Sequence, residues 1–227
     1  MLNLGLGRDG AAATPLRILA LGAHSDDIEI GCGATLLSLI AAAPAPSPSL
    51  RWVVFSAPGA RADEARSSAA SFLAGASNAA LDLMDFRDGF FPYQGAEIKE
   101  RFEELKSFEP DVVFTHRWGD RHQDHRLVSE LSWNTFRDHL VLEYEIPKYD
   151  GDLGTPNFFI PVTAAARLRK IDLLMEHFGT QRSKGWFTRE TFEGLMRLRG
   201  VECASRTGYA EAFDARKITI GLTESTD

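Results

Sequence analysis

Short apolar runs alternate with stretches of helical periodicity along the first half of the chain. The apolar runs cover residues 16–23, 52–55, 81–84 and 112–115. Apolar residues recur at helical spacing from Ile28 to before Pro44, over 63–74 and over 97–108. Uninterrupted apolar runs are typical of strands buried on both faces, and strands that alternate with helices form parallel sheets. The pattern therefore predicts an α/β fold, a three-layer sandwich around a mostly parallel, Rossmann-like sheet.

The second half of the chain continues the helical periodicity, over 122–136, 164–178 and 189–199. Two short apolar segments, 141–144 and 158–162, would extend or flank the sheet. Prolines among small residues make 43–49 a connection between elements, and the glycine- and alanine-rich residues 1–15 are expected to form a loose arm. Because no internal repeat or long linker divides the chain, we expect a single domain over 1–227.

The size of the chain and its cysteine content limit the kind of metal site to expect. At 227 residues the chain can bury a full core without disulfides or a structural metal. Cys32 and Cys203 are too few for a disulfide framework and fit no zinc-finger spacing. A bound metal would therefore be functional, with histidine and carboxylate ligands.

The charge balance and the apolar segments narrow the class of partner. The chain has 25 Lys and Arg against 32 Asp and Glu, a formal net charge of −7, which argues against a nucleic-acid partner. The longest uncharged stretch, 30–50, contains three prolines, so we expect no membrane insertion. The N-terminus lacks a cationic run followed by an apolar core, so no secretory signal is expected. The expected location is the cytoplasm, and a homo-oligomer is compatible with the sequence.

Two polar clusters follow predicted strands, at 24–27 and at 116–125, and together they hold four of the six histidines. Ligands of parallel α/β sheets bind beyond the carboxyl ends of the strands, which is where both clusters lie. If the strands 16–23 and 112–115 are neighbours, the clusters would converge. These two segments are therefore the candidate active site.

The spacing within the clusters predicts metal-assisted hydrolysis. His24 and Asp27 are three residues apart, so both can lie on one face while Asp26 points elsewhere. His122 and His125 have the same spacing. Two imidazoles and one carboxylate are a ligand set of catalytic zinc, which keeps a fourth position open. A second carboxylate beside a ligand is well placed to take a proton from water.

Plainer interpretations exist for each cluster taken alone. Adjacent aspartates after a strand, such as Asp26 and Asp27, often cap a helix, and His122 and His125 could form a solvated helix face. The matching ligand types at the carboxyl ends of two predicted parallel strands favour one shared site over two unrelated helix ends.

A nucleotide-binding module is the alternative from another functional class. Residues 31–33, Gly-Cys-Gly, begin like a dinucleotide fingerprint, but Leu36 occupies the third glycine position. The carboxylates of the preceding turn would repel a pyrophosphate at the helix N-terminus. We therefore favour the hydrolytic site.

The two clusters resemble the signatures of a known family. Residues 23–36, Ala-His-Ser-Asp-Asp-Ile-Glu-Ile-Gly-Cys-Gly-Ala-Thr-Leu, resemble the Ala-His-Pro-Asp-Asp signature of the LmbE-like, or PIG-L-type, deacetylases. Residues 122–125, His-Gln-Asp-His, resemble their His-x-Asp-His signature. Softer matches lie at 57–64, 88–89 and 209–213. Ser25 replaces the usual proline, which removes a rigid φ from the turn but no ligand.

The resemblance implies a zinc-dependent hydrolase that removes an N-acetyl group from an amino sugar of the N-acetylglucosamine type. The zinc ligands that it implies are His24, Asp27 and His125. The other implied roles are general base for Asp26, oxyanion stabilisation by a protonated His122, orientation of a histidine by Asp124, and substrate contact by Arg61.

Several alternatives stay open. Asp88 is either a turn residue or a ligand of sugar hydroxyls, and for 181–187 an exposed loop is favoured over a substrate wall. Ligand types alone do not separate Zn2+ from Fe2+ or Co2+. The substrate could instead be an acylated natural product or another non-sugar amide, and either Asp26 or His122 could protonate the leaving amine.

Overall fold

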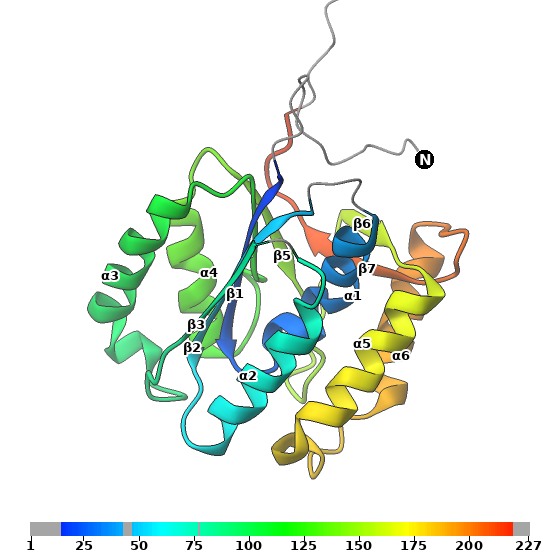
Figure 1. The fold of residues 1–227 in the computed structure, drawn as a ribbon, viewed down its shortest axis with the longest axis horizontal. Coiled ribbons are helices and arrows are strands. Elements are labelled where there is room, and N and C mark those ends of the chain that lie inside the picture. The colour runs from blue at the N-terminus through cyan, green and yellow to red at the C-terminus, as the bar shows by residue number, and fades with distance from the viewer. Residues whose placement is uncertain (1–14, 43–46, 77, 220–227) are drawn as a thin grey trace, which may run out of the picture.

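A mixed seven-stranded sheet lies between two layers of helices in the computed structural model, which describes residues 15–42, 47–76 and 78–219 (Figure 1). The strands are β1 (Arg17–His24), β2 (Ser49–Ser56), β3 (Asn78–Leu83), β4 (Val112–His116), β5 (Leu140–Tyr144), β6 (Phe158–Pro161) and β7 (Ala210–Asp214). Their order in the sheet is β3-β2-β1-β4-β5-β7-β6. The predicted three-layer fold with a mostly parallel sheet is confirmed.

The helices divide between the two faces of the sheet. The α-helices are α1 (Asp27–Ala42), α2 (Ala60–Phe72), α3 (Gly95–Leu105), α4 (Gln123–Thr135), α5 (Ala164–His177) and α6 (Arg189–Glu202). Short 3-10 helices cover Phe91–Tyr93, Lys106–Phe108 and Gly179–Gln181. In Figure 1, α3 and α4 cover one face, and α1, α2, α5 and α6 cover the other. No helix within the described ranges is long and apolar enough to cross a membrane.

Strand β1 is buried on both faces, as its apolar run predicts. Ile18 and Ala20 join the core under α1, α2, α5 and α6, whereas Leu19 and Leu21 join the core under α3 and α4. β1 pairs in parallel with β2 on one side and with β4 on the other. The central position of β1 places the residues that follow it at the middle of the sheet edge.

Strand β7 is a feature that the sequence pattern did not predict. It pairs antiparallel with both β5 and β6, which makes the sheet mixed rather than parallel throughout. Its sequence, Ala-Glu-Ala-Phe-Asp, lacks an apolar run. The buried Glu211 is compensated by Lys170 Nζ at 2.6 Å and by the backbone N–H groups of Ala34 and Thr35. A charged residue therefore occupies a buried strand because partners from distant elements satisfy it.

The ends of the other elements differ slightly from the predicted ones. The helix expected over 63–74 begins earlier, and the one over 97–108 ends in a separate 3-10 turn. The expected arm falls almost entirely outside the described residues, as does most of the proline-rich connection at 43–49.

Gly31 lets α1 pass close to β5, and its replacement by alanine should destabilise the protein. A Cβ at Gly31 would lie 2.2 Å from Cδ2 and 2.4 Å from Cγ of Tyr144, whose ring is fully buried. Overpacking of this kind costs about 1–3 kcal/mol. We expect Gly31→Ala to lower the free energy of unfolding by that amount in urea titrations.

A glycine of another helix offers the matched control. A Cβ at Gly194 in α6 would meet no atom within 4 Å. Gly194→Ala should therefore stabilise the protein by about 0.5–1 kcal/mol, since alanine is the better helix former. Equal stability of Gly31→Ala and the wild type would contradict the close approach.

Candidate active site

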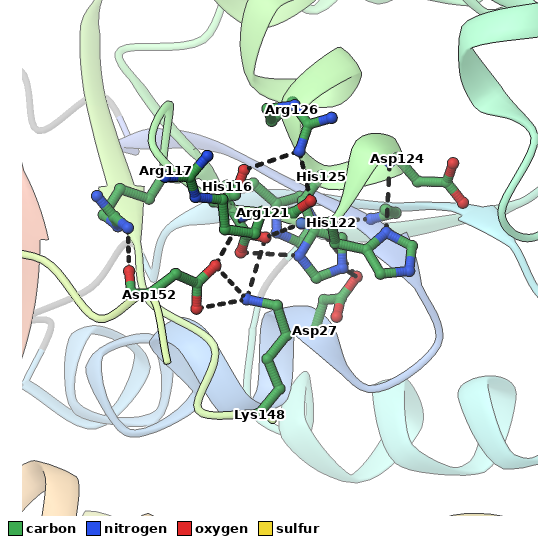
Figure 2. Close-up of polar contacts among 12 residues, drawn as sticks. Asp27, His116, Arg117, Arg121, His122, Asp124, His125, Arg126, Lys148 and Asp152 are labelled. Atoms are coloured by element: carbon green, nitrogen blue, oxygen red, sulfur yellow. Dashed lines mark hydrogen bonds and ion pairs between the residues drawn. The ribbon is translucent and has the colours of Figure 1, made fainter. Parts of the chain in front are cut away.

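The candidate site lies where the carboxyl ends of β1 and β4 meet. His24 is the last residue of β1, and Asp27 is the first residue of α1. His122 caps the N-terminus of α4, and His125 lies in its first turn. Because β1 and β4 are neighbours in the sheet, the two polar clusters converge. Figure 2 shows the side chains of Asp27, His122 and His125 gathered at this edge.

Three donor atoms of this group have the spacing of ligands around one ion. His24 Nδ1 lies 3.2 Å from His125 Nε2 and 3.4 Å from Asp27 Oδ2, and the latter two atoms are 3.6 Å apart. Ligands of tetrahedral zinc, with bonds of about 2.0–2.1 Å, lie about 3.3 Å from one another. The donor set therefore fits a zinc ion. His122 also comes close enough to His24 and His125 to act as a ligand.

The protonation of two of these donors suits metal binding, which requires neutral histidine and ionised carboxylate. Burial, and then the neighbouring His116, lowers the pKa of His125 to about 4. Burial alone would raise the pKa of Asp27, but the nearby His125 and His116 outweigh it and hold that pKa well below its usual range. Both shifts are in the direction that metal binding requires. Contacts with Asp124, Asp27 and Asp88 outweigh burial and raise the pKa of His24, from which a bound metal would have to displace a proton.

Asp120 orients His125 from the side away from the donor atoms. Its Oδ2 accepts a hydrogen bond of 3.0 Å from His125 Nδ1, which leaves Nε2 directed at Asp27. Its Oδ1 lies 3.0 Å from Lys148 Nζ, and Lys148 also binds Asp152 at 2.7 Å. Figure 2 shows Lys148 reaching toward Asp152. Sequence reasoning passed over Asp120, although its position in the second polar cluster was a signal for it.

Asp88 and Asp124 hold the other nitrogen of His24. Nε2 of His24 lies 3.0 Å from Asp88 Oδ1 and 3.2 Å from Asp124 Oδ2. The buried Asp124 also accepts hydrogen bonds from the backbone N–H groups of Gly89 at 2.6 Å and Phe91 at 3.1 Å. Gly89 has φ +80°, a conformation that favours glycine. Asp88 thus lies in a tight turn and also points into the site. Its interpretation as a turn residue is therefore compatible with its interpretation as a ligand of sugar hydroxyls.

Asp26 lines the same cleft as the three donor atoms and contacts Arg61, at the start of α2. Arg61 Nη2 donates a hydrogen bond of 2.8 Å to Asp26 Oδ1, and Arg61 Nε donates one of 2.8 Å to Ser25 Oγ. Burial raises the pKa of Asp26, and the Arg61 guanidinium partly offsets that rise. A buried carboxylate with a raised pKa beside a metal-type donor set is suited to accept a proton.

The pKa of His122 is lowered, which favours the neutral ring over the protonated form expected from the resemblance. Burial and the nearby charge of His24 lower its pKa. Its Nδ1 accepts a hydrogen bond of 3.3 Å from the backbone N–H of Asp124, so the proton of the neutral ring lies on Nε2. His122 can therefore offer an N–H donor without carrying a charge.

His116, at the end of β4, is a buried site residue to which the sequence assigned no role. Its Nε2 accepts a hydrogen bond of 2.9 Å from the backbone N–H of Ala23 and lies 3.2 Å from Asp27 Oδ2. Its ring stacks on that of His125 with centroids 3.9 Å apart. His116 therefore packs the donor set against the sheet. Its place in the polar cluster was visible in the sequence, but the stacking was not.

A cleft of about 100 Å3 that opens to solvent is lined by the donor set, Asp26, Arg61, Asp88 and His122. Its remaining wall consists of Ile146, Lys148, Lys184 and Trp186. Within 181–187, Lys184 is exposed and Trp186 is half-buried, as expected of an exposed loop, and both side chains also line the cleft. The backbone N–H of Gly185 donates to Tyr149 Oη at 3.0 Å, which connects this loop to the segment that follows β5.

A protein-family model described as PIG-L, GlcNAc-PI de-N-acetylase, matches residues 19–136. This segment begins in β1 and ends just after α4, so it contains both polar clusters. Among curated proteins, none is significantly similar to this chain in sequence.

Solved structures share the fold at low sequence identity. A conserved protein from Thermus thermophilus has 21% identity and a TM-score of 0.70, covering 93% of this chain and 100% of its own. The N,N'-diacetylchitobiose deacetylase from Pyrococcus horikoshii has 18% identity and a TM-score of 0.66, covering 88% and 83%. The 4-carboxy-2-hydroxymuconate hydratase from Pseudomonas putida has 16% identity and a TM-score of 0.70, covering 92% and 100%. The fold therefore accommodates more than one reaction, and the site must discriminate between them.

Proposed function

Because this chain belongs to the PIG-L family of de-N-acetylases, we propose that it is a zinc-dependent hydrolase that removes an N-acetyl group from an amino sugar of the N-acetylglucosamine type. The observation that carries this proposal is the group of three donor atoms 3.2–3.6 Å apart, with the carboxylate of Asp26 beside them in one cleft. Zinc held by His24, Asp27 and His125 would supply Lewis-acid chemistry to the site.

Asp26 is the general base in this proposal. As the oxygen of water bonds to the acyl carbon, one proton of that water passes to the Asp26 carboxylate. The raised pKa of Asp26 favours this transfer, and Arg61 holds the carboxylate in place.

His122 stabilises the oxyanion that forms on the acyl oxygen. Its Nε2–H donates a hydrogen bond from a neutral ring, and a fixed donor of this kind costs no reorganisation during the reaction. In this proposal Asp26, which holds the proton taken from water, returns it to the nitrogen as the C–N bond breaks. The products are the free amine and acetate.

A substrate screen tests the proposal. Purified protein with added zinc is incubated with N-acetylated sugars, sugar nucleotides, glycosides and non-sugar N-acyl amides, and free amine and released acetate are measured. We expect amine and acetate in equal amounts from the amino sugars. Release from the non-sugar amides alone would favour an amidase that acts on acylated natural products. Water addition to an unsaturated acid without amine release would contradict hydrolysis. Parallel assays with Fe2+ and Co2+ identify the metal that supports turnover.

A further inference from the structure

Ser25, where the resembling family carries proline, forms a hydrogen bond that proline could not form. Its side chain is fully buried, and its Oγ accepts a hydrogen bond of 2.8 Å from Nε of Arg61. The same guanidinium donates from Nη2 to Asp26 Oδ1 at 2.8 Å. The side chain of Arg61, from α2, thus forms hydrogen bonds with two successive residues of the turn between β1 and α1.

This geometry restrains a long side chain at both of its contact points. A guanidinium is a planar fork of donors, and an exposed arginine loses much rotamer freedom when it is held in one position. The side chain of Arg61 is only 18% exposed and that of Asp26 only 6%. Without the hydroxyl of Ser25, Arg61 would keep its hydrogen bond to Asp26 but would be free to rotate about it.

The two oxygens of Asp26 are left in different environments. Oδ1 is occupied by Arg61, whereas Oδ2 accepts no hydrogen bond from the part of the chain that the structure describes. Asp26 lines the cleft together with the donor set. A carboxylate fixed through one oxygen presents the other in a defined direction.

We propose that Ser25 is a positioning residue that locks Arg61 onto Oδ1 of Asp26, so that Oδ2 faces the cleft and takes the proton. This restraint of Arg61 by Ser25, called the lock below, follows from the contacts alone. Its effect on turnover rests on the proposed function. Arg61 then acts mainly on the general base, and its expected contact with the substrate becomes secondary.

Nuclear magnetic resonance tests the lock without any assay of activity. The Nε–H signal of Arg61, assigned by its loss in Arg61→Gln, should exchange slowly with solvent in the wild type. In Ser25→Ala it should exchange at least about 10-fold faster, because a hydrogen bond of a charged donor is lost. The matched control is Ser38→Ala, which removes a hydroxyl from α1 that donates to the backbone of Ala34 at 2.7 Å. The control should leave the Arg61 signal unchanged.

A double-mutant cycle tests the effect on turnover. We expect Ser25→Ala to lower kcat about 10-fold with KM and metal content unchanged. Arg61→Gln should lower kcat further, and the double variant should match Arg61→Gln alone, because Ser25 acts through Arg61. Ser25→Pro, which restores the residue of the family, should behave like Ser25→Ala and serves if the alanine variant does not fold.

The possible results separate this inference from the proposed function. An unchanged Arg61 signal in Ser25→Ala would overturn the lock, as would multiplicative losses of kcat in the double variant. A rise in KM alone for Arg61→Gln would show that Arg61 serves the substrate, and that too would overturn the inference. A wild type that hydrolyses no substrate would contradict the proposed function, and the exchange rate of Arg61 would then decide the lock by itself.

Discussion

Replacement of Asp26 by asparagine is expected to lower kcat by about 10²–10⁴-fold while the bound metal stays. Asparagine keeps the size of the side chain and an oxygen that can accept the hydrogen bond from Arg61, but its amide cannot take a proton from water. Asp26 contributes no atom to the group of three donors, so metal binding should not change. The measurements are steady-state amine release and metal content per chain.

An exposed aspartate provides the control for this substitution. Asp63 lies in the first turn of α2 and pairs with Arg66 on the surface at 3.0 Å. Asp63→Asn makes the same chemical change outside the cleft and should retain wild-type kcat. Wild-type turnover by Asp26→Asn would show that another group accepts the proton.

Loss of one metal ligand should abolish turnover together with metal binding. In Asp27→Ala, the atom that lies 3.4 Å from His24 Nδ1 and 3.6 Å from His125 Nε2 is removed. His24→Ala should have the same effect, since each variant leaves two protein ligands of three. We expect purified protein of either variant to carry no zinc and to release amine no faster than wild type stripped by a chelator.

Asp120→Asn should weaken zinc binding without abolishing it, in contrast to the two ligand variants. Asp120 accepts the hydrogen bond from His125 Nδ1 and does not belong to the three donors. Loss of such an outer partner typically costs about 10–100-fold in metal affinity or activity, so zinc should bind more weakly but still bind. Chelator competition measures this affinity. A wild type that purifies without metal and keeps full activity in chelator would refute the metal site altogether.

The part of the fold that the sequence predicted is the part built from apolar runs. Strands β1, β2, β4 and β5 are buried on both sheet faces, so each contains an uninterrupted apolar run that the sequence pattern reveals. β7 does not, because its buried Glu211 is stabilised by Lys170 and by α1 rather than by its own neighbours in sequence. Burial of a charge depends on partners that no local pattern reveals.

The sequence likewise predicted one part of the candidate site, and the packing of separate elements decided the other part. Spacing places His24 with Asp27 and His122 with His125, because residues three apart share a face at a helix start. The same rule predicts a separate direction for Asp26. Asp120 and His116 were visible as members of a polar cluster. Their contacts, with His125 of α4 and with Asp27 of α1, depend on how β4 and the loop after it pack against these helices.

By itself, the sequence determined the donor types, their order along the chain and the sheet edge at which they gather. Local spacing and strand burial decide these features, and both are properties of neighbouring residues. Only the tertiary structure decided that Arg61 from α2 binds Asp26 and Ser25, that the pKa of His122 is lowered, and that Lys184 and Trp186 line the cleft. These features arise where separate elements pack together, and packing depends on the whole set of contacts rather than on any one segment.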